Sequence, residues 1–166
     1  MIMSQGVNAV LKMSKVIDAL QKIKFRYEEK PQYSGLPLMN IGTIRGGISR
    51  KYEDFRPSIL PDVCTIVVDV RFVPSMTHQT ILEDIENVLN KLKREDPELQ
   101  TEIEILGPPK FAWRPPYEIS PDEYIVRVVK EAHKYVLGKE PYVGDISPFK
   151  VGGADVSHLM KAGTKA

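Results

Sequence analysis

The stretch that decides the fold is Cys64-Thr-Ile-Val-Val-Asp-Val-Arg-Phe72, in which successive side chains alternate between two kinds of environment. Period-two alternation predicts a β-strand with one face buried and the other open to solvent. On this strand Asp69 and Arg71 share the open face with Thr65 and Val67, whereas the opposite face is apolar. An acid and a base are therefore expected side by side on an accessible sheet surface.

Two further stretches have the character of strands. The first is Asn40-Ile-Gly-Thr-Ile-Arg45, which Gly46-Gly47 is expected to end, and a long polar loop then leads to the Cys64 strand. The second is Thr101-Glu-Ile-Glu-Ile-Leu106, which alternates and is followed by Gly107-Pro-Pro109. The sequence therefore predicts three strands.

Apolar residues recur at helical spacing in two segments that flank the first two strands. One predicts a helix over about Val7–Lys24, for which Asn8 is a candidate N-cap. The other predicts a helix over about Gln79–Arg94, capped by Thr77. Each helix carries one apolar face for packing.

The resulting order is helix, strand, strand, helix, strand. That order predicts an α+β fold, a ferredoxin-like two-layer α/β sandwich with two helices on one face of an antiparallel sheet. A complete version would begin with one more strand just before Met1, so the first strand is expected to be missing and the chain to be truncated. Residues 1–110 are expected to form this domain.

After Pro109 the character of the sequence changes. Ser120-Pro-Asp-Glu123 predicts a helix start with Ser120 as cap, and the helix should run through Ile125 and Val136 to about Gly138. Gly152 to Gly163 then predicts a glycine-rich turn and a short helix, which Asp155 would cap. This segment is too small for a core of its own, so residues 111–166 are expected to be part of a second, α/β domain.

Composition restricts the classes of function. The 166 residues hold 23 Lys and Arg against 22 Asp and Glu, a formal charge of +1, which provides no general field for nucleic acid or an anionic membrane. The single cysteine cannot form an internal disulfide, and no apolar run approaches the roughly 20 residues that span a bilayer. We expect a cytoplasmic protein that binds neither nucleic acid nor membrane.

Several short motifs together resemble one enzyme family. In order and spacing, the chain is similar to the acetylornithine deacetylase and succinyl-diaminopimelate desuccinylase family of dinuclear zinc amidohydrolases, which includes aminoacylase and carboxypeptidase relatives. The motifs are Gly6-Val-Asn-Ala-Val10, Asn40-Ile-Gly-Thr-Ile-Arg-Gly-Gly47, Leu60-Pro-Asp62, Val68-Asp-Val-Arg71, Gly152-Gly-Ala-Asp155 and Ala162-Gly163. Each motif alone is common in turns, but together they cover nearly the whole chain.

The resemblance implies a two-domain enzyme that uses zinc or cobalt to deacylate small, carboxylate-bearing N-acyl amino acids. Residues 1–110 would be its lid, through which a homodimer forms, and residues 111–166 the return into the catalytic domain. The family's metal ligands and general base would lie before Met1 or after Ala166. His78, His133 and His158 lie on three separate predicted elements. The chain alone is therefore expected neither to bind the metal nor to catalyse.

The resemblance also implies substrate-binding residues. Arg71 matches the family's lid arginine, whose guanidinium would clamp a substrate carboxylate, although an ion pair with Asp69 is the alternative. Ser58 stands where the family often has an asparagine, and Gly153 and Ala154 match a loop whose backbone faces the substrate. No catalytic residue is expected in this chain.

A different class of function fits the same topology. Ferredoxin-like domains also act as free-standing dimerisation or small-molecule-binding modules, and an unpaired sheet edge could be covered by a second copy. An RNA-binding function is less well supported, because the central strands lack paired exposed aromatic residues.

Overall fold

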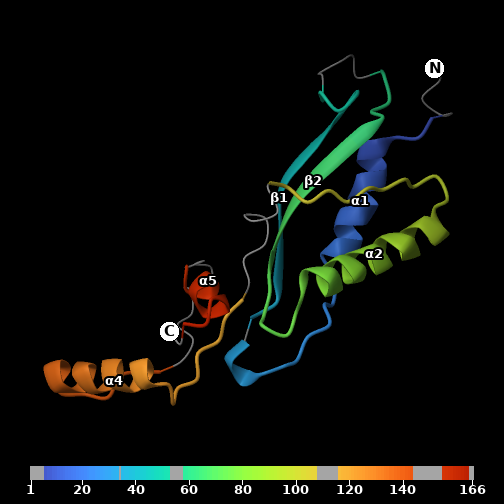
Figure 1. Ribbon diagram of the computed structural model, residues 1–166. Helices are drawn as coiled ribbons and strands as arrows, with labels where there is room; N and C mark the ends of the chain where they lie inside the picture. The colour runs from blue at the N-terminus through green and yellow to red at the C-terminus, as the bar shows by residue number, and fades with distance from the viewer. Residues whose placement is uncertain (1–5, 34, 53–57, 108–115, 144–154, 165–166) are drawn as a thin grey trace. The chain divides into compact units, whose positions relative to one another are not determined.

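The computed structural model describes residues 6–33, 35–52, 58–107, 116–143 and 155–164 (Figure 1). The chain divides into two compact units, which are described separately. The first consists of Met1–Tyr27, Pro37–Arg71 and Met76–Glu104, and the second of Glu28–Leu36, Phe72–Ser75 and Ile105–Ala166. The predicted boundary near residue 110 stays a prediction.

The sheet of the first unit contains the two strands expected before the second helix. β1 (Leu38–Gly47) and β2 (Val63–Arg71) pair antiparallel, with Asn40 opposite Asp69. The register shifts between Ile41 and Thr43, so Gly42 is an extra, bulged residue.

β1 ends at the glycine pair as predicted, although both glycines still belong to the strand. Gly46 lies within the strand opposite Cys64, and a Cβ at this position would come within 2.5 Å of Val10 Cγ2. A glycine is needed here because the first helix approaches the strand backbone closely.

Both predicted helices of this unit form, and both begin at the predicted caps. α1 (Ala9–Leu20) starts after Asn8, whose Oδ1 accepts hydrogen bonds from the backbone N–H groups of Val10 and Leu11 at 3.0 and 3.1 Å. α2 (His78–Glu95) starts after Thr77, which forms a reciprocal capping box with Thr80. α1 is shorter than predicted, since it ends at Leu20.

The core lies between the helices and the apolar face of the sheet. Val16 and Leu20 of α1 cluster with Leu89 of α2 and Leu99, and all four are at most 6% exposed. The partly buried residues that pack against this cluster include Met39, Ile41 and Ile66 of the strands and Ile85, Val88 and Leu92 of α2. The fold is therefore α+β, with helices against one face of an antiparallel sheet, as the pattern predicts.

The predicted third strand over Thr101–Leu106 is wrong. These residues are described but belong to no ladder, and the sheet of the described chain contains β1 and β2 alone. A strand requires a neighbour for its backbone groups, and no described strand lies beside this segment. Its acidic side chains instead pair with Arg50, whose Nη2 lies 2.6 Å from Glu102 and whose Nη1 lies 2.6 Å from Glu104.

The second unit contains α4 (Tyr124–Leu137), which ends at Gly138 in the left-handed conformation. Ser120 does not cap this helix as predicted. The N-cap is Glu123, and Ser120 closes a turn ahead of it, because its carbonyl accepts from Glu123 N at 3.1 Å. The serine hydroxyl accepts from Asp122 N. The predicted cap therefore lies three residues before the observed N-cap, Glu123.

The remaining helical segments of this unit are short. They are a 3-10 turn over Pro31–Tyr33 and α5 (Val156–Lys161), for which Asp155 is the N-cap residue as predicted but makes no side-chain cap bond. Within the unit, Tyr33 Oη donates to Glu118 at 2.7 Å and Lys30 pairs with the same carboxylate at 3.2 Å. No helix in the described residues is long and apolar enough to cross a membrane.

Candidate functional site

The outer face of the sheet, on the side away from the helices, is polar and carries Arg71. Arg71 Nε donates to Asp69 Oδ2 at 2.7 Å, with the arginine side chain 41% and the aspartate 58% exposed. Residues two apart on a strand share a face, and Asn40 lies directly opposite Asp69 on the neighbouring strand. The ion pair that the sequence offered as an alternative for Arg71 is therefore present.

Apolar surface lies next to the guanidinium. Leu38 stands directly opposite Arg71 in the register and is 51% exposed. A guanidinium recognises a carboxylate through its planar N–H donors, and an adjacent apolar side chain can contact a small hydrocarbon group. This end of the outer face therefore carries the side chains that bind a carboxylate next to a small hydrocarbon group.

The other end of the outer face is formed by the start of the β1–β2 connection. Tyr52 Oη and Thr65 Oγ1 share a hydrogen bond, while Asp62 Oδ1 accepts from the backbone N–H of Ser49 at 2.8 Å. Ser49 and Tyr52 both have positive φ, which is uncommon for residues other than glycine. The aspartate of the Leu60-Pro-Asp62 motif therefore holds the connection in a strained conformation.

Of the four predicted substrate-binding residues, the structure describes Ser58 and Arg71. Ser58 is exposed in the connection that precedes β2, whereas Arg71 ends that strand. β2 has nine residues, so its two ends are separated by about 26 Å. Gly153 and Ala154 lie outside the described residues. The roles of all four residues stay predictions.

The histidines lie on different helices. His78 is the first residue of α2, and His158 is exposed on α5. His133 lies in the second unit, where its Nδ1 donates to the carbonyl oxygen of Lys139 at 3.1 Å. Within the described ranges, no group of three or more His, Cys, Asp or Glu side chains could hold a metal ion. The described residues therefore do not fit a zinc or cobalt site.

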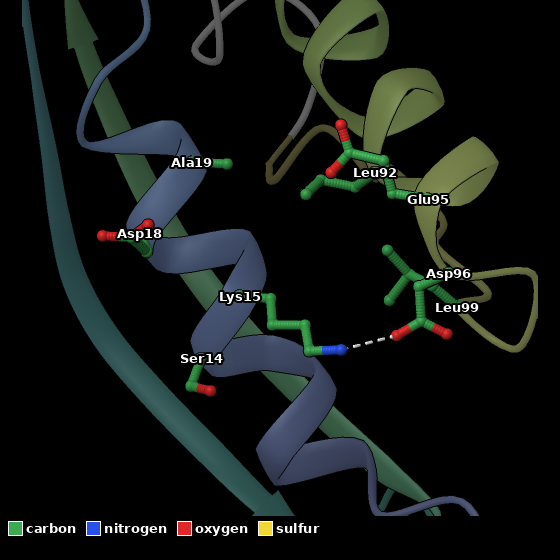
Figure 2. Close-up of a pocket in the computed structure, with 8 residues that line it drawn as sticks. All are labelled: Ser14, Lys15, Asp18, Ala19, Leu92, Glu95, Asp96 and Leu99. Atoms are coloured by element: carbon green, nitrogen blue, oxygen red, sulfur yellow. Dashed lines mark hydrogen bonds and ion pairs between the residues drawn. The ribbon is translucent and has the colours of Figure 1, made fainter.

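A groove of about 490 Å³ lies between the two helices of the first unit (Figure 2). Lys15 and Asp96 reach toward one another across it, with Nζ 2.9 Å from Oδ2, and Lys12 lies 2.6 Å from the same carboxylate. The lining residues are Ser14, Lys15, Asp18, Ala19, Leu92, Glu95, Asp96 and Leu99. The ion pairs across this groove link α1 to the end of α2.

Sequence reasoning missed this link because its partners are more than 80 positions apart. The two lysine hydrogen bonds hold the pKa of Asp96 at about 2, below its ordinary value of 3.8. In the unfolded chain the same carboxyl binds a proton near its ordinary pKa of 3.8. The stabilisation from Asp96 is therefore complete above about pH 4 and is lost as the pH falls from 4 toward 2.

We expect Asp96→Asn to lower the urea midpoint at pH 7 and to weaken its pH dependence between pH 4 and 2. The neutral amide cannot pair with the two lysines, so protonation at this position no longer matters. The measurement is urea unfolding, followed by circular dichroism, across that pH range. Glu98→Gln is the control, since Glu98 also pairs with Lys12 but is 66% exposed. An unchanged pH profile in Asp96→Asn would contradict the assignment.

Comparison with known proteins connects this fold to a family. Residues 3–97, which include α1, both strands and α2, match the family described as the peptidase dimerisation domain, M20_dimer. A curated relative is the N-formyl-4-amino-5-aminomethyl-2-methylpyrimidine deformylase of Halalkalibacterium halodurans, 22% identical over 151 residues. The alignment covers 81% of this chain but 33% of the relative, so the chain spans about a third of that protein's length. The chain therefore belongs to the M20 peptidase family and carries its dimerisation domain.

Proposed function

We propose that this chain supplies the lid and dimerisation surface of a metal-dependent amidohydrolase that removes acyl groups from N-acyl amino acids. The family match over residues 3–97 supports the reaction class, since it is a peptidase family. The relative is named as a deformylase, and removal of a formyl group from nitrogen is also cleavage of an amide. The acetylornithine deacetylase or succinyl-diaminopimelate desuccinylase type is the specific activity that we propose.

The observation that carries the substrate class is Arg71 on the open sheet face. Asp69 engages its Nε and thereby fixes the plane of the guanidinium, which is the geometry that paired recognition of a carboxylate requires. Zinc or cobalt would polarise the scissile amide and activate water in the complete enzyme, and no described residue is assigned to the metal. The contribution of this chain is recognition of the substrate and pairing with a second copy.

Substitution of Arg71 tests the substrate class. We expect N-acetyl-L-ornithine to shift the backbone NMR signals near Arg71, and Arg71→Gln to weaken this binding about tenfold or more. Arg71→Lys should rescue it only in part, because an ammonium cannot form the paired contact. N-acetyl-L-ornithine amide, which lacks the carboxylate, should bind the native chain as poorly as the acid binds Arg71→Gln.

Arg45→Gln is the matched control, because Arg45 shares the sheet face but stands opposite Thr65, six positions before Arg71 on β2. Binding that is equal in the native chain and Arg71→Gln would rule out the clamp. Binding that depends equally on both arginines would indicate general attraction to positive charge instead of a specific site.

The alternative function is a free-standing dimerisation or small-molecule-binding module. Two other measurements test the supporting role and the homodimer that the proposed function requires. We expect the purified chain with zinc or cobalt to show no turnover of acetylornithine above the blank, and to sediment as a dimer. Turnover well above the blank would contradict a purely supporting role. A monomer at all accessible concentrations would contradict homodimerisation through these residues.

A further inference from the structure

The groove between α1 and the end of α2 is a part of the first unit that the proposed function does not use. It lies on the helical side of the sheet, whereas Arg71 lies on the outer face, so a ligand in the groove would be independent of the proposed clamp. Its volume of about 490 Å³ falls within the range of about 300–1,000 Å³ that is typical of small-molecule sites. The groove is therefore large enough to take a small ligand.

The floor of the groove is apolar. Leu99 belongs to the buried core cluster, and Leu92 is partly buried against the same cluster. Ala19 points from α1 toward Leu92 across the groove (Figure 2), and its methyl group is too short to fill the space between the two helices. A hydrocarbon group placed between these two side chains would be removed from water on two sides, which favours its binding.

The rim of the groove carries three carboxylates and one ammonium group. Two of the carboxylates have cationic partners, since Asp96 pairs with two lysines and Asp18 pairs with Lys22 at 2.8 Å. Glu95, in contrast, forms no ion pair or side-chain hydrogen bond with any residue in the described ranges. The charge that the rim offers to a ligand is therefore negative, and it is located on Glu95.

Lys15 determines where along the groove a cation can bind. Its ammonium group lies 2.9 Å from Asp96, and Ala19 follows it on α1 by one turn, or about 6 Å along the helix axis. Because like charges repel, a ligand cation is disfavoured beside Lys15 and favoured beside Glu95. Figure 2 shows the Glu95 carboxylate extending from α2 toward α1. An acceptor for a cation thus lies next to the apolar floor.

We propose that this groove binds a small organic cation, namely a primary ammonium or guanidinium group on a hydrocarbon body. The cation donates hydrogen bonds to the Glu95 carboxylate, and the hydrocarbon lies between Ala19 and Leu92. A body of about six carbons is roughly as long as the 8–10 Å between the axes of packed helices. Both contacts are required, because an exposed ion pair alone contributes little to binding.

The test is an NMR titration of the full chain with n-hexylammonium, followed through the backbone amide signals of Ala19, Leu92 and Glu95. We expect these signals to shift, and methylammonium, which lacks the hydrocarbon body, to bind about tenfold more weakly or worse. Uncharged n-hexanol and the variant Glu95→Gln should each lower the affinity about threefold or more. Glu98→Gln is the matched control, because Glu98 is 66% exposed near the same helix end but does not line the groove.

Salt provides a second measurement that needs no variant, since about 1 M NaCl should weaken the binding of n-hexylammonium but not that of n-hexanol. Equal affinity of the native chain and Glu95→Gln, equal affinity for the long and the short amine, or an affinity that is independent of salt would overturn the proposal. Tighter binding of Nα-acetyl-L-lysine amide than of n-hexylammonium would also overturn it, because the occupant would then be a lysine side chain of a protein partner.

Discussion

Replacing Leu89 with alanine is expected to lower the free energy of unfolding of the first compact unit by about 2–5 kcal/mol. Leu89 is 6% exposed and packs in the cluster that joins α1, α2 and Leu99. Removing its three terminal carbons forfeits their transfer from water and leaves a cavity among side chains that have few ways to collapse. In a core this small, such a loss is a large fraction of the total stability.

The measurement is urea unfolding at pH 7, followed by circular dichroism at 222 nm. Leu11→Ala is the matched control, because Leu11 is also a helical leucine but is 65% exposed, so its truncation leaves no cavity. The two substitutions have the same effect on intrinsic helix propensity, and their difference therefore isolates burial. Equal losses in the two variants would show that the core is not organised around Leu89.

Replacing Asp84 with alanine is expected to cost about 1–3 kcal/mol of folding free energy, because it removes a buried carboxylate that accepts two hydrogen bonds from Arg26. Asp84 is 7% exposed on α2, and its carboxylate accepts from the backbone N–H of Arg26 at 2.9 Å and from the side-chain Nε at 2.5 Å. It thereby holds the chain that leaves α1 against the second helix.

Glu83 provides an internal comparison for this prediction. It also pairs with Arg26, at 2.9 Å, but it is 43% exposed and accepts from the side-chain Nη2 of that residue. Exposed ion pairs contribute little and are weakened by salt, so Glu83→Ala should be much milder. In 1 M NaCl the difference between the two variants should persist. A loss for Glu83→Ala as large as that for Asp84→Ala would show that the backbone bond is not the decisive interaction.

The sequence predicts well those elements whose signals are local. Asn8 and Thr77 are caps of the expected type, and both helices begin directly after them. The alternation from Cys64 onward places Asp69 and Arg71 on the outer face, and their ion pair follows from the two-residue spacing. The family resemblance is confirmed at the level of the M20 family, while the specific activity stays a proposal.

Features that depend on distant partners are not predictable in the same way. Thr101–Leu106 has the pattern of a strand but no described neighbour, so pattern alone predicts the wrong state. Asp84 and Asp96 look like ordinary charges on or after a surface helix, and only the fold reveals that Arg26 and Lys12 reach them. Ser120 shows the opposite error, in which a good capping sequence is used by a turn instead.

The bulge in β1 has a consequence for insertions and deletions. Gly42 has no partner, whereas Ile41 stands opposite Val68 and Thr43 opposite Val67, which are adjacent on β2. Deleting Gly42 would thus restore a regular ladder without moving any other side chain to the other face. Removing a residue from either side of the bulge would instead shift part of the strand. Related chains that differ in length by one residue can therefore differ at position 42 and still present the same outer face.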